Sequence, residues 1–361
     1  MEKKRLQYLD EIKGASILLV VFCHSVLLPS NTIIGNILML IAWGAVPCFF
    51  MVTGSIYHNT VFFDWRKWKI RLAELYIILA IWKGIHLIYF ILCDHVSFTK
   101  AQLIQFLLFW GDIENVSVGQ LWFMYAYIMM MLFLPVSYYF FHSGKEGERI
   151  LLFVLTIAFI GGLGLPSLNM IFKVLAKVLR KNTCDVMNLC KAIPFGSMWK
   201  NMLFYFITGA FLGKHHDEIR DNFDNGRWKK WWIYSSILIG VLGLMLIKFF
   251  QTGSFCWEGI YLYNGYDWIS TGFVSIGIYL SFVCKLGNGF MSNCLQYIGK
   301  NTMGIYYMHC ILADIYVRVW NIWLKGTYSV FFNILKTGIV VVACILVIKF
   351  VKKIPVIKKL V

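Results

Sequence analysis

Long apolar runs constrain this chain more than any other feature of its sequence. A helix needs ~20 consecutive, mostly apolar residues to cross a bilayer, and several runs in the 361 residues reach that length. Hydrophobic residues make up 59% of the chain and charged residues 14%, whereas soluble domains have roughly 45–50% and ~25%. The sequence therefore predicts an all-α, polytopic transmembrane helical bundle, a single integral-membrane domain over residues 1–361 with no fused soluble domain.

The order of the apolar runs predicts about ten spanning helices. The first run carries Lys13 and His24, and no small-residue cleavage site follows it, so we expect it to be retained as a helix. Residues 99–111 are apolar on one face but short, which favours a helix in the membrane interface. The expected spans lie near residues 12–30, 33–57, 70–93, 120–142, 150–171, 195–213, 231–252, 267–287, 302–323 and 328–350.

Basic residues dominate the charge balance, which gives a formal net charge of +16. Lys and Arg gather in short loops and at both ends, so we assign the charge to membrane topology and anionic lipids and expect no nucleic-acid partner. With ten spans these loops share one side, which predicts that both termini are cytoplasmic. Residues 172–200 are the exception, because they are basic but would lie outside. Either a span is miscounted there, or this loop binds an acidic substrate.

The first span carries an unusual pair of ionisable side chains. An ionisable group inside a membrane span is costly to bury, so its default interpretation is functional. Lys13 and His24 are about three helical turns apart, which puts them on nearly the same face and roughly 16 Å apart along the axis. Histidine suits general-base work because its ordinary pKa lies near neutrality. The alternative is a structural histidine that is hydrogen-bonded to a neighbouring helix.

Other polar and aromatic residues suggest a site shared between helices. Arg71 begins a span, where its guanidinium could fork onto phosphate oxygens or pair with Glu74. Trp122 belongs either to an interface belt or to the wall of an acyl or sugar pocket. His309 could converge with His24, but no third ligand at metal spacing accompanies either histidine, so no metal site is expected.

An ordered set of motifs resembles the membrane acyltransferase 3 family. In that family a basic residue, ten intervening positions and a histidine mark the first span, as Lys13 and His24 do here after Leu9-Asp10. The resemblance covers essentially the whole chain. Within the family, the chain is most similar to short O-acetyltransferases of bacterial surface polysaccharides. The other matching stretches are Pro47-Cys48-Phe49-Phe50-x-x-Thr53-Gly54, Leu121-Trp122-Phe123, Tyr205-Phe206-x-x-Gly209 and Gly304-Ile305-Tyr306-x-x-His309.

The resemblance implies an acyltransferase in the plasma membrane of a bacterium. It would move an acyl group, usually acetyl, from cytoplasmic acyl-CoA to a hydroxyl of a cell-surface glycan or lipid-linked sugar, with no bound cofactor. His24 would be the catalytic base or a transient acyl acceptor, and Lys13 with Arg71 would belong to the donor site. The other candidates for substrate or donor binding are Asp10, Trp122, Tyr306 and His309.

The chain departs from the family pattern at four positions. Lys13 replaces the commoner arginine, Trp68 the first arginine of a pair, Glu74 a proline and Gln120 a histidine. Two other functions stay open at this point. One is a transporter or flippase for a lipid-linked sugar or small amphiphile, although no inverted repeat or pair of broken helices is visible. The other is a catalytically idle member that acts as a sensor or assembly partner.

Overall fold

A computed structural model gives the fold, and it is all-helical over the residues that it describes. These are residues 6–360 with short gaps, which fall at 29–31, 61, 95, 110–112, 115, 117, 183–185, 193–196, 254–261, 263–264, 285–288, 325–327 and 356. The elements run from α1 near the N-terminus to α15 near the C-terminus. The predicted fold class, a helical bundle, is confirmed.

Six helical stretches in the described part of the chain are long and apolar enough to cross a membrane. Their length and hydropathy make this a multi-pass membrane protein. They are α2 and α3 together (Ile33–Ala42 and Ala45–His58), α4 (Trp65–Asp94), the stretch Gly119–His142 that includes α6 (Trp122–His142), the stretch Gly144–Val178, α11 (Trp231–Thr252) and α15 (Val330–Val351).

Helices also lie at the four remaining predicted spans. They are α1 (Gln7–Cys23), α9 (Ser197–Lys214), α12 (Ile269–Val283) and α14 (Thr302–Leu324). That these four also cross the bilayer stays a prediction. The predicted interfacial segment contains the short α5 (Lys100–Leu108), whose start is closed by a capping box between Thr99 and Gln102. Two further short helices are α10 (His216–Asp224) and α13 (Phe290–Lys300).

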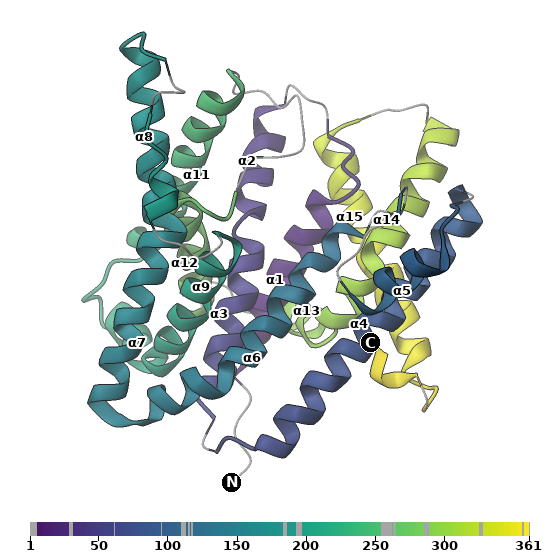
Figure 1. The fold of residues 1–361 in the computed structure, drawn as a ribbon, viewed down its shortest axis with the longest axis horizontal. Helices are drawn as coiled ribbons and strands as arrows, with labels where there is room; N and C mark the ends of the chain where they lie inside the picture. The colour runs from purple at the N-terminus through teal and green to yellow at the C-terminus, as the bar shows by residue number, and fades with distance from the viewer. Residues whose placement is uncertain are drawn as a thin grey trace.

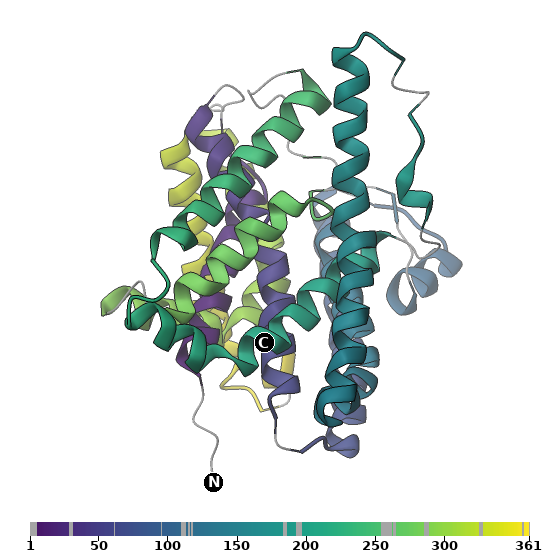
Figure 2. The same ribbon diagram turned by 90° about the vertical axis from the view of Figure 1, so that its left-hand side faces the viewer.

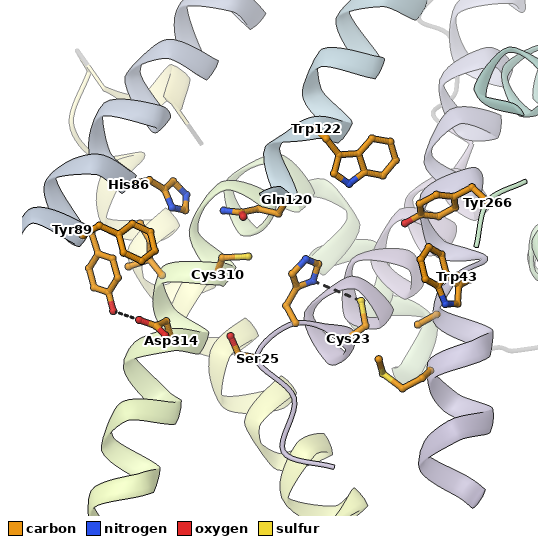
Figure 3. A pocket seen from close by; sticks show the side chains of 15 residues that line it. Cys23, Ser25, Trp43, His86, Tyr89, Gln120, Trp122, Tyr266, Cys310 and Asp314 are labelled. Atoms are coloured by element: carbon orange, nitrogen blue, oxygen red, sulfur yellow. Dashed lines mark hydrogen bonds between the residues drawn. The ribbon is translucent and has the colours of Figure 1, made fainter. Parts of the chain in front are cut away.

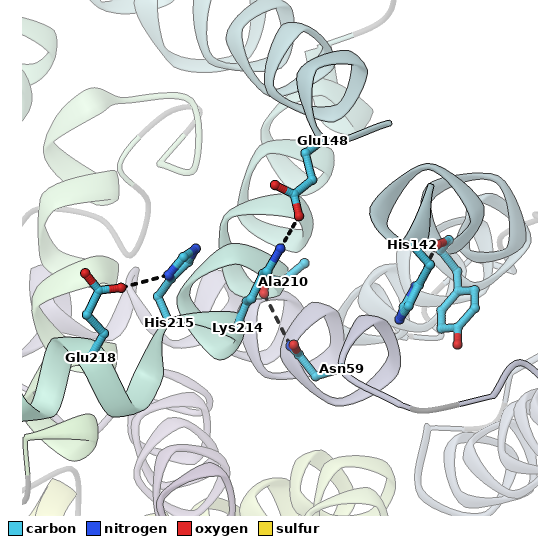
Figure 4. Close-up of polar contacts among 8 residues, drawn as sticks. Asn59, His142, Glu148, Ala210, Lys214, His215 and Glu218 are labelled. Atoms are coloured by element: carbon cyan, nitrogen blue, oxygen red, sulfur yellow. Dashed lines mark hydrogen bonds and ion pairs between the residues drawn. The ribbon is translucent and has the colours of Figure 1, made fainter. Parts of the chain in front are cut away.

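α1 lies in the middle of the bundle, packed against α3, α13, α14 and α15 (Figure 1). The helix ends that carry most of the basic residues share one end of the bundle. α1, α4, α7 (Gly144–Phe159) and α11 begin there, and α3, α6, α9 and α15 end there (Figures 1 and 2). Polar contacts join neighbouring helices at this end: Lys214 pairs with Glu148, and Asn59 donates to the carbonyl of Ala210 (Figure 4).

Glycines let two pairs of helices approach until their backbones touch. A Cβ on Gly54 of α3 would meet the Phe206 carbonyl of α9 at 1.9 Å, and one on Gly209 of α9 would meet the Met51 carbonyl of α3 at 2.0 Å. Gly14 of α1 faces the backbone of α13 in the same way. Such small-residue contacts are typical of membrane helices, which associate by close packing. The central helices α1 and α3 are therefore held at fixed distances from their neighbours.

The first span ends earlier than the sequence predicts. α1 stops at Cys23, and His24 follows it in an extended conformation with φ −100° and ψ 144°, so His24 does not lie within a continuous helix over 12–30. Ser25 then takes a positive φ of 48°, which is uncommon outside glycine. The physical cause is long-range, since side chains of α15 bind the backbone groups that a continued helix would have used.

The predicted span at 150–171 is part of a much longer helical stretch. α7, a π-helical turn at Ile160–Gly164 and α8 (Leu165–Val178) continue one another over 35 residues. Lys173 and Lys177 therefore lie on α8, not in the loop 172–200 to which the sequence analysis assigned them. The boundary was wrong because a helix need not stop where its apolar stretch stops.

The close contact between α3 and α9 predicts a position-specific effect of adding one methyl group. Gly209→Ala should lower the free energy of unfolding by about 1–3 kcal/mol, because the Cβ overlaps the α3 backbone. Gly338→Ala on α15 is the matched control, since no atom lies within 4 Å of its Cβ position and alanine favours a helix by up to ~1 kcal/mol. Thermal unfolding in detergent checks this, and equal midpoints for the two variants would contradict it.

Candidate active site

Two cavities in the described part of the chain are relevant to the site, and the larger of these two surrounds the end of α1. It has a volume of about 360 Å³, and His24 lines it. The rings of Trp43, Trp122 and Tyr266 form one wall; the Tyr266 centroid lies 4.7 Å from that of Trp43 and 5.4 Å from that of Trp122. Figure 3 shows these rings on one side, and His86, Tyr89, Cys310 and Asp314 on the other. The cavity thus has an aromatic side and a polar side.

The imidazole of His24 is held in one tautomer. Its Nδ1 lies 2.7 Å from the carbonyl oxygen of Val20. Because a carbonyl oxygen can only accept, Nδ1 donates the proton and Nε2 keeps its lone pair. The ring of His309 packs edge-to-face on it, with centroids 5.0 Å apart. His24 therefore offers a nitrogen that is able to accept a proton or an acyl group.

Lys336 of α15 binds the backbone that carries His24. Its ammonium donates to the carbonyls of Val21 (3.2 Å), His24 (2.5 Å) and Ser25 (3.2 Å), and its side chain is fully buried. A helix C-terminus leaves carbonyl groups unsatisfied and carries partial negative charge. One buried cation therefore satisfies the carbonyls where α1 breaks, and it obtains the hydrogen bonds that its own burial requires.

Asn333, one turn earlier on α15, completes this attachment. Its Nδ2 donates to the carbonyl of Phe22 at 3.0 Å, and its Oδ1 accepts the backbone N–H of Leu27 at 2.9 Å. The Ser329 backbone N–H also donates to the Leu27 carbonyl at 3.0 Å. The segment from the end of α1 to Leu27 is thus bound to α15 from both sides of His24.

The smaller cavity, of about 240 Å³, is basic. Lys13, Arg71 and Lys300 line it, and none of the described residues around it is acidic. Lys13 is paired with Asp10 at 2.6 Å, and this carboxylate is buried with 2% of its surface exposed. Arg71 lies 3.9 Å from Glu74, a long ion pair at the edge of the site. Three cations around one cavity favour an anionic ligand, and phosphate suits the arginine fork.

Tyr306 stands between the two cavities. Its ring lines the smaller cavity, and its hydroxyl donates to the backbone carbonyl of Gln120, which lines the larger one. The neighbouring Phe123 also lines the smaller cavity, with its ring centroid 5.4 Å from that of Tyr306, whereas Trp122 lines the larger. A wall of two aromatic rings therefore separates the basic cavity from the cavity of His24.

Comparison with known protein families shows which family this chain belongs to. A family model described as an acyltransferase domain matches residues 6–349. The chain belongs to the acyltransferase 3 family. No curated protein and no solved structure shows a significant match to the chain. Membership makes the chain an acyltransferase of the membrane-bound kind, which implies an acyl donor and an acceptor.

The structure brings together the residues that the family motifs single out. His24 and Trp122 line the larger cavity, whereas Lys13, Arg71 and Tyr306 line the smaller one. The two other candidates line neither cavity: Asp10 pairs with Lys13, and His309 packs behind His24. The roles of all seven candidates stay predictions, but the structure divides them into two neighbouring groups.

Several lining residues could not be singled out from the sequence. Lys300 is the last residue of α13 and lines the smaller cavity. Only its position just before the Gly304 motif could have indicated a role for it in the sequence. Cys310 was given no role, although it follows His309 directly and lines the larger cavity. Asp314 accepts from Tyr89 at 2.6 Å and pairs with Arg318, which makes a polar edge to the larger cavity that only the fold reveals.

The attachment of α1 to α15 predicts that Lys336 supports the site from outside the cavity. Lys336→Met keeps a long unbranched side chain but leaves three carbonyls without their donor, which should cost about 1–3 kcal/mol of unfolding free energy and lower acyl transfer. Lys349→Met, at an exposed position on the same helix, is the control. Thermal unfolding and turnover of purified protein check this. An unchanged melting midpoint in Lys336→Met would contradict it.

Proposed function

We propose that this chain is an O-acyltransferase that moves an acyl group, acetyl in the first instance, from acyl-CoA to a hydroxyl of a cell-surface glycan or lipid-linked sugar. The observation that carries the proposal is the position of His24. Its free Nε2 belongs to a ring that lines an aromatic cavity, and a basic cavity lies just behind the Tyr306 wall.

The basic cavity is the proposed entry for the donor. Lys13, Arg71 and Lys300 would bind the phosphate groups of acyl-CoA, by charge and by hydrogen bonding. The thioester would then reach past Tyr306 toward His24. Because the basic helix ends share one end of the bundle, the positive-inside rule supports a cytoplasmic position for this end and for both termini. We accordingly propose the plasma membrane of a bacterium as the location.

The larger cavity is the proposed site of the acceptor. Binding pockets combine apolar and aromatic walls with a few polar groups that orient the ligand. Trp43, Trp122 and Tyr266 would supply the flat apolar surface, and Asp314 with Gln120 the hydrogen-bonding groups for a sugar. This division of aromatic and polar sides supports a carbohydrate acceptor.

Two reaction courses use the same atom of His24. In the first, Nε2 takes the proton of the acceptor hydroxyl, the oxygen attacks the thioester carbonyl, the C–S bond breaks and the imidazolium returns the proton to the CoA thiolate. In the second, Nε2 itself attacks the carbonyl, the C–S bond breaks and the CoA thiolate leaves. The acceptor hydroxyl then attacks the acyl-imidazole, the N–acyl bond breaks, and the hydroxyl proton passes to the CoA thiolate. Trapping a radiolabelled acyl-protein distinguishes the second course from the first.

Gln120 is placed to assist either course. Its Nε2 is buried and has no hydrogen-bond partner among the described residues, although the residue lines the His24 cavity. A buried donor without a partner is costly. An amide N–H aimed at the thioester oxygen would use that donor as negative charge develops there, a contribution worth ~10²–10³ in rate in other acyl-transfer sites.

The decisive experiment looks for the product and for donor turnover together. Purified protein in liposomes is given labelled acetyl-CoA and a lipid-linked glycan, and mass spectrometry follows the ester on the glycan. An enzyme consumes acetyl-CoA and forms the ester, whereas a transporter moves the glycan without donor turnover. Movement of the glycan without ester formation would reject the proposal.

Loss of the His24 imidazole should abolish transfer. His24→Asn is expected to lower turnover by about 10²–10⁴ or more, because it removes the proton acceptor, while the amount of folded protein in the membrane stays unchanged. His215→Asn, at an exposed histidine that contacts Glu218 (Figure 4), is the matched control. Initial rates of ester formation check this, and wild-type rates in His24→Asn would refute the assignment.

Loss of the Arg71 guanidinium should weaken donor binding more than turnover. Arg71→Ala is expected to raise KM for acyl-CoA by about 10-fold or more, since a hydrogen bond to a charged group contributes ~1.5–3 kcal/mol. Arg149→Ala is the control, because Arg149 is exposed and paired with Glu146 away from both cavities. Steady-state kinetics at several salt concentrations measure this. An unchanged KM in Arg71→Ala would show that the donor binds elsewhere.

A further inference from the structure

We propose that His24, His309 and Cys310 form a binding site for a borderline-soft divalent cation such as Zn²⁺. One ligand atom from each residue lies within 4.8 Å of the other two. His24 comes from the end of α1, whereas His309 and Cys310 are consecutive residues of α14. The site therefore exists only because the fold brings residues 24 and 309 together.

Both imidazoles have the orientation that metal-binding histidines usually have. His309 Nδ1 lies 2.6 Å from the carbonyl oxygen of Tyr306, just as His24 Nδ1 lies 2.7 Å from that of Val20. Each Nδ1 must therefore carry its proton, which leaves a lone pair on both Nε2 atoms; that of His309 faces the Cys310 thiol. A backbone carbonyl on the second nitrogen is the common outer support of a metal-bound histidine, and it fixes the tautomer.

Cys310 supplies the third ligand. Its Sγ lies 3.2 Å from His309 Nε2, and the residue lines the larger cavity. On binding, the thiol would release its proton to solvent, and the thiolate would form the metal–sulfur bond. Tetrahedral zinc places ligand atoms roughly 3.3–3.7 Å apart. Because the ligand atoms lie within 4.8 Å of one another, no pair has to move closer by much more than ~1 Å.

The ligand set and the surroundings favour Zn²⁺ over harder cations. Two imidazoles and a thiolate suit zinc, whereas Mg²⁺ and Ca²⁺ prefer oxygen ligands. The buried Lys336 ammonium repels a second cation nearby. Its charge is partly balanced, because it donates hydrogen bonds to backbone carbonyl oxygens. The negative charge of the Cys310 thiolate would offset that repulsion, whereas Asp314 of the same cavity is already paired with Arg318. The fourth position would face the cavity.

Zinc at this site would occupy the nitrogen of His24 that the proposed reaction needs. We therefore expect Zn²⁺ to inhibit acyl transfer, an expectation that rests on the proposed function. The proposed metal site does not depend on that function, because metal binding can be measured without acyl-CoA.

The test is Co²⁺ binding to the full-length protein in detergent, after treatment with a chelator. Co²⁺ replaces Zn²⁺ and gives thiolate charge-transfer absorption when a cysteine is a ligand. One equivalent should bind with this absorption. Cys310→Ser should abolish the band, and both it and His309→Ala should weaken affinity by about 10-fold or more. Cys344→Ser changes a buried cysteine of α15 outside the cluster, so it should leave the absorption band and the Co²⁺ affinity unchanged.

The outcomes separate the two proposals. Binding that needs Cys310 and His309 supports the site, whether or not His24 proves essential for transfer. No saturable Co²⁺ binding, or a band that persists in Cys310→Ser, overturns it. Cys310→Ser differs by one atom, so it serves as the deciding variant if His309→Ala fails to fold. Melting curves of each variant without metal establish that the comparison is between folded proteins.

Discussion

The contact between the Lys336 ammonium and the carbonyls at the end of α1 determines where His24 lies. Burying a charge in a membrane protein is costly unless every donor finds a partner, and breaking a helix there is costly for the same reason. Here each group removes the cost of burying the other, since the ammonium donates to the carbonyls of Val21, His24 and Ser25. His24 can therefore leave the helix and line a cavity.

The arrangement of two cavities follows from that break. Lys13 sits near the start of α1 and His24 just beyond its end, so one helix contributes a cation to the smaller cavity and an imidazole to the larger. Tyr306 and Phe123 fill the space between them. A donor with a charged head and a short reactive tail fits such a division, because the head and the tail require different surroundings.

Much of the fold could be predicted from the sequence, because hydrophobic length is a local property. Helices lie at all ten predicted spans, and Lys13 and Arg71 line one cavity, although their role there stays a prediction. The early end of α1 could not be predicted, since the side chains that cause it lie more than 300 residues away in the sequence. The proximity of Cys310 to His24 was hidden for the same reason, and so was the position of Lys300 on the same cavity as Arg71. Such contacts depend on which helices are neighbours, which apolar periodicity does not reveal.

The long stretch Gly144–Val178 has a geometric consequence. Its 35 residues extend over about 52 Å at ~1.5 Å per residue, whereas the hydrocarbon core of a bilayer is ~30 Å thick. Tilting absorbs only part of the difference, so roughly the last two turns of α8 project past the lipid, as its height above its neighbours in Figure 2 suggests. Lys173 and Lys177 then give this projecting helix end a positive charge near the lipid headgroups. Anionic polymers at the membrane surface would meet it first.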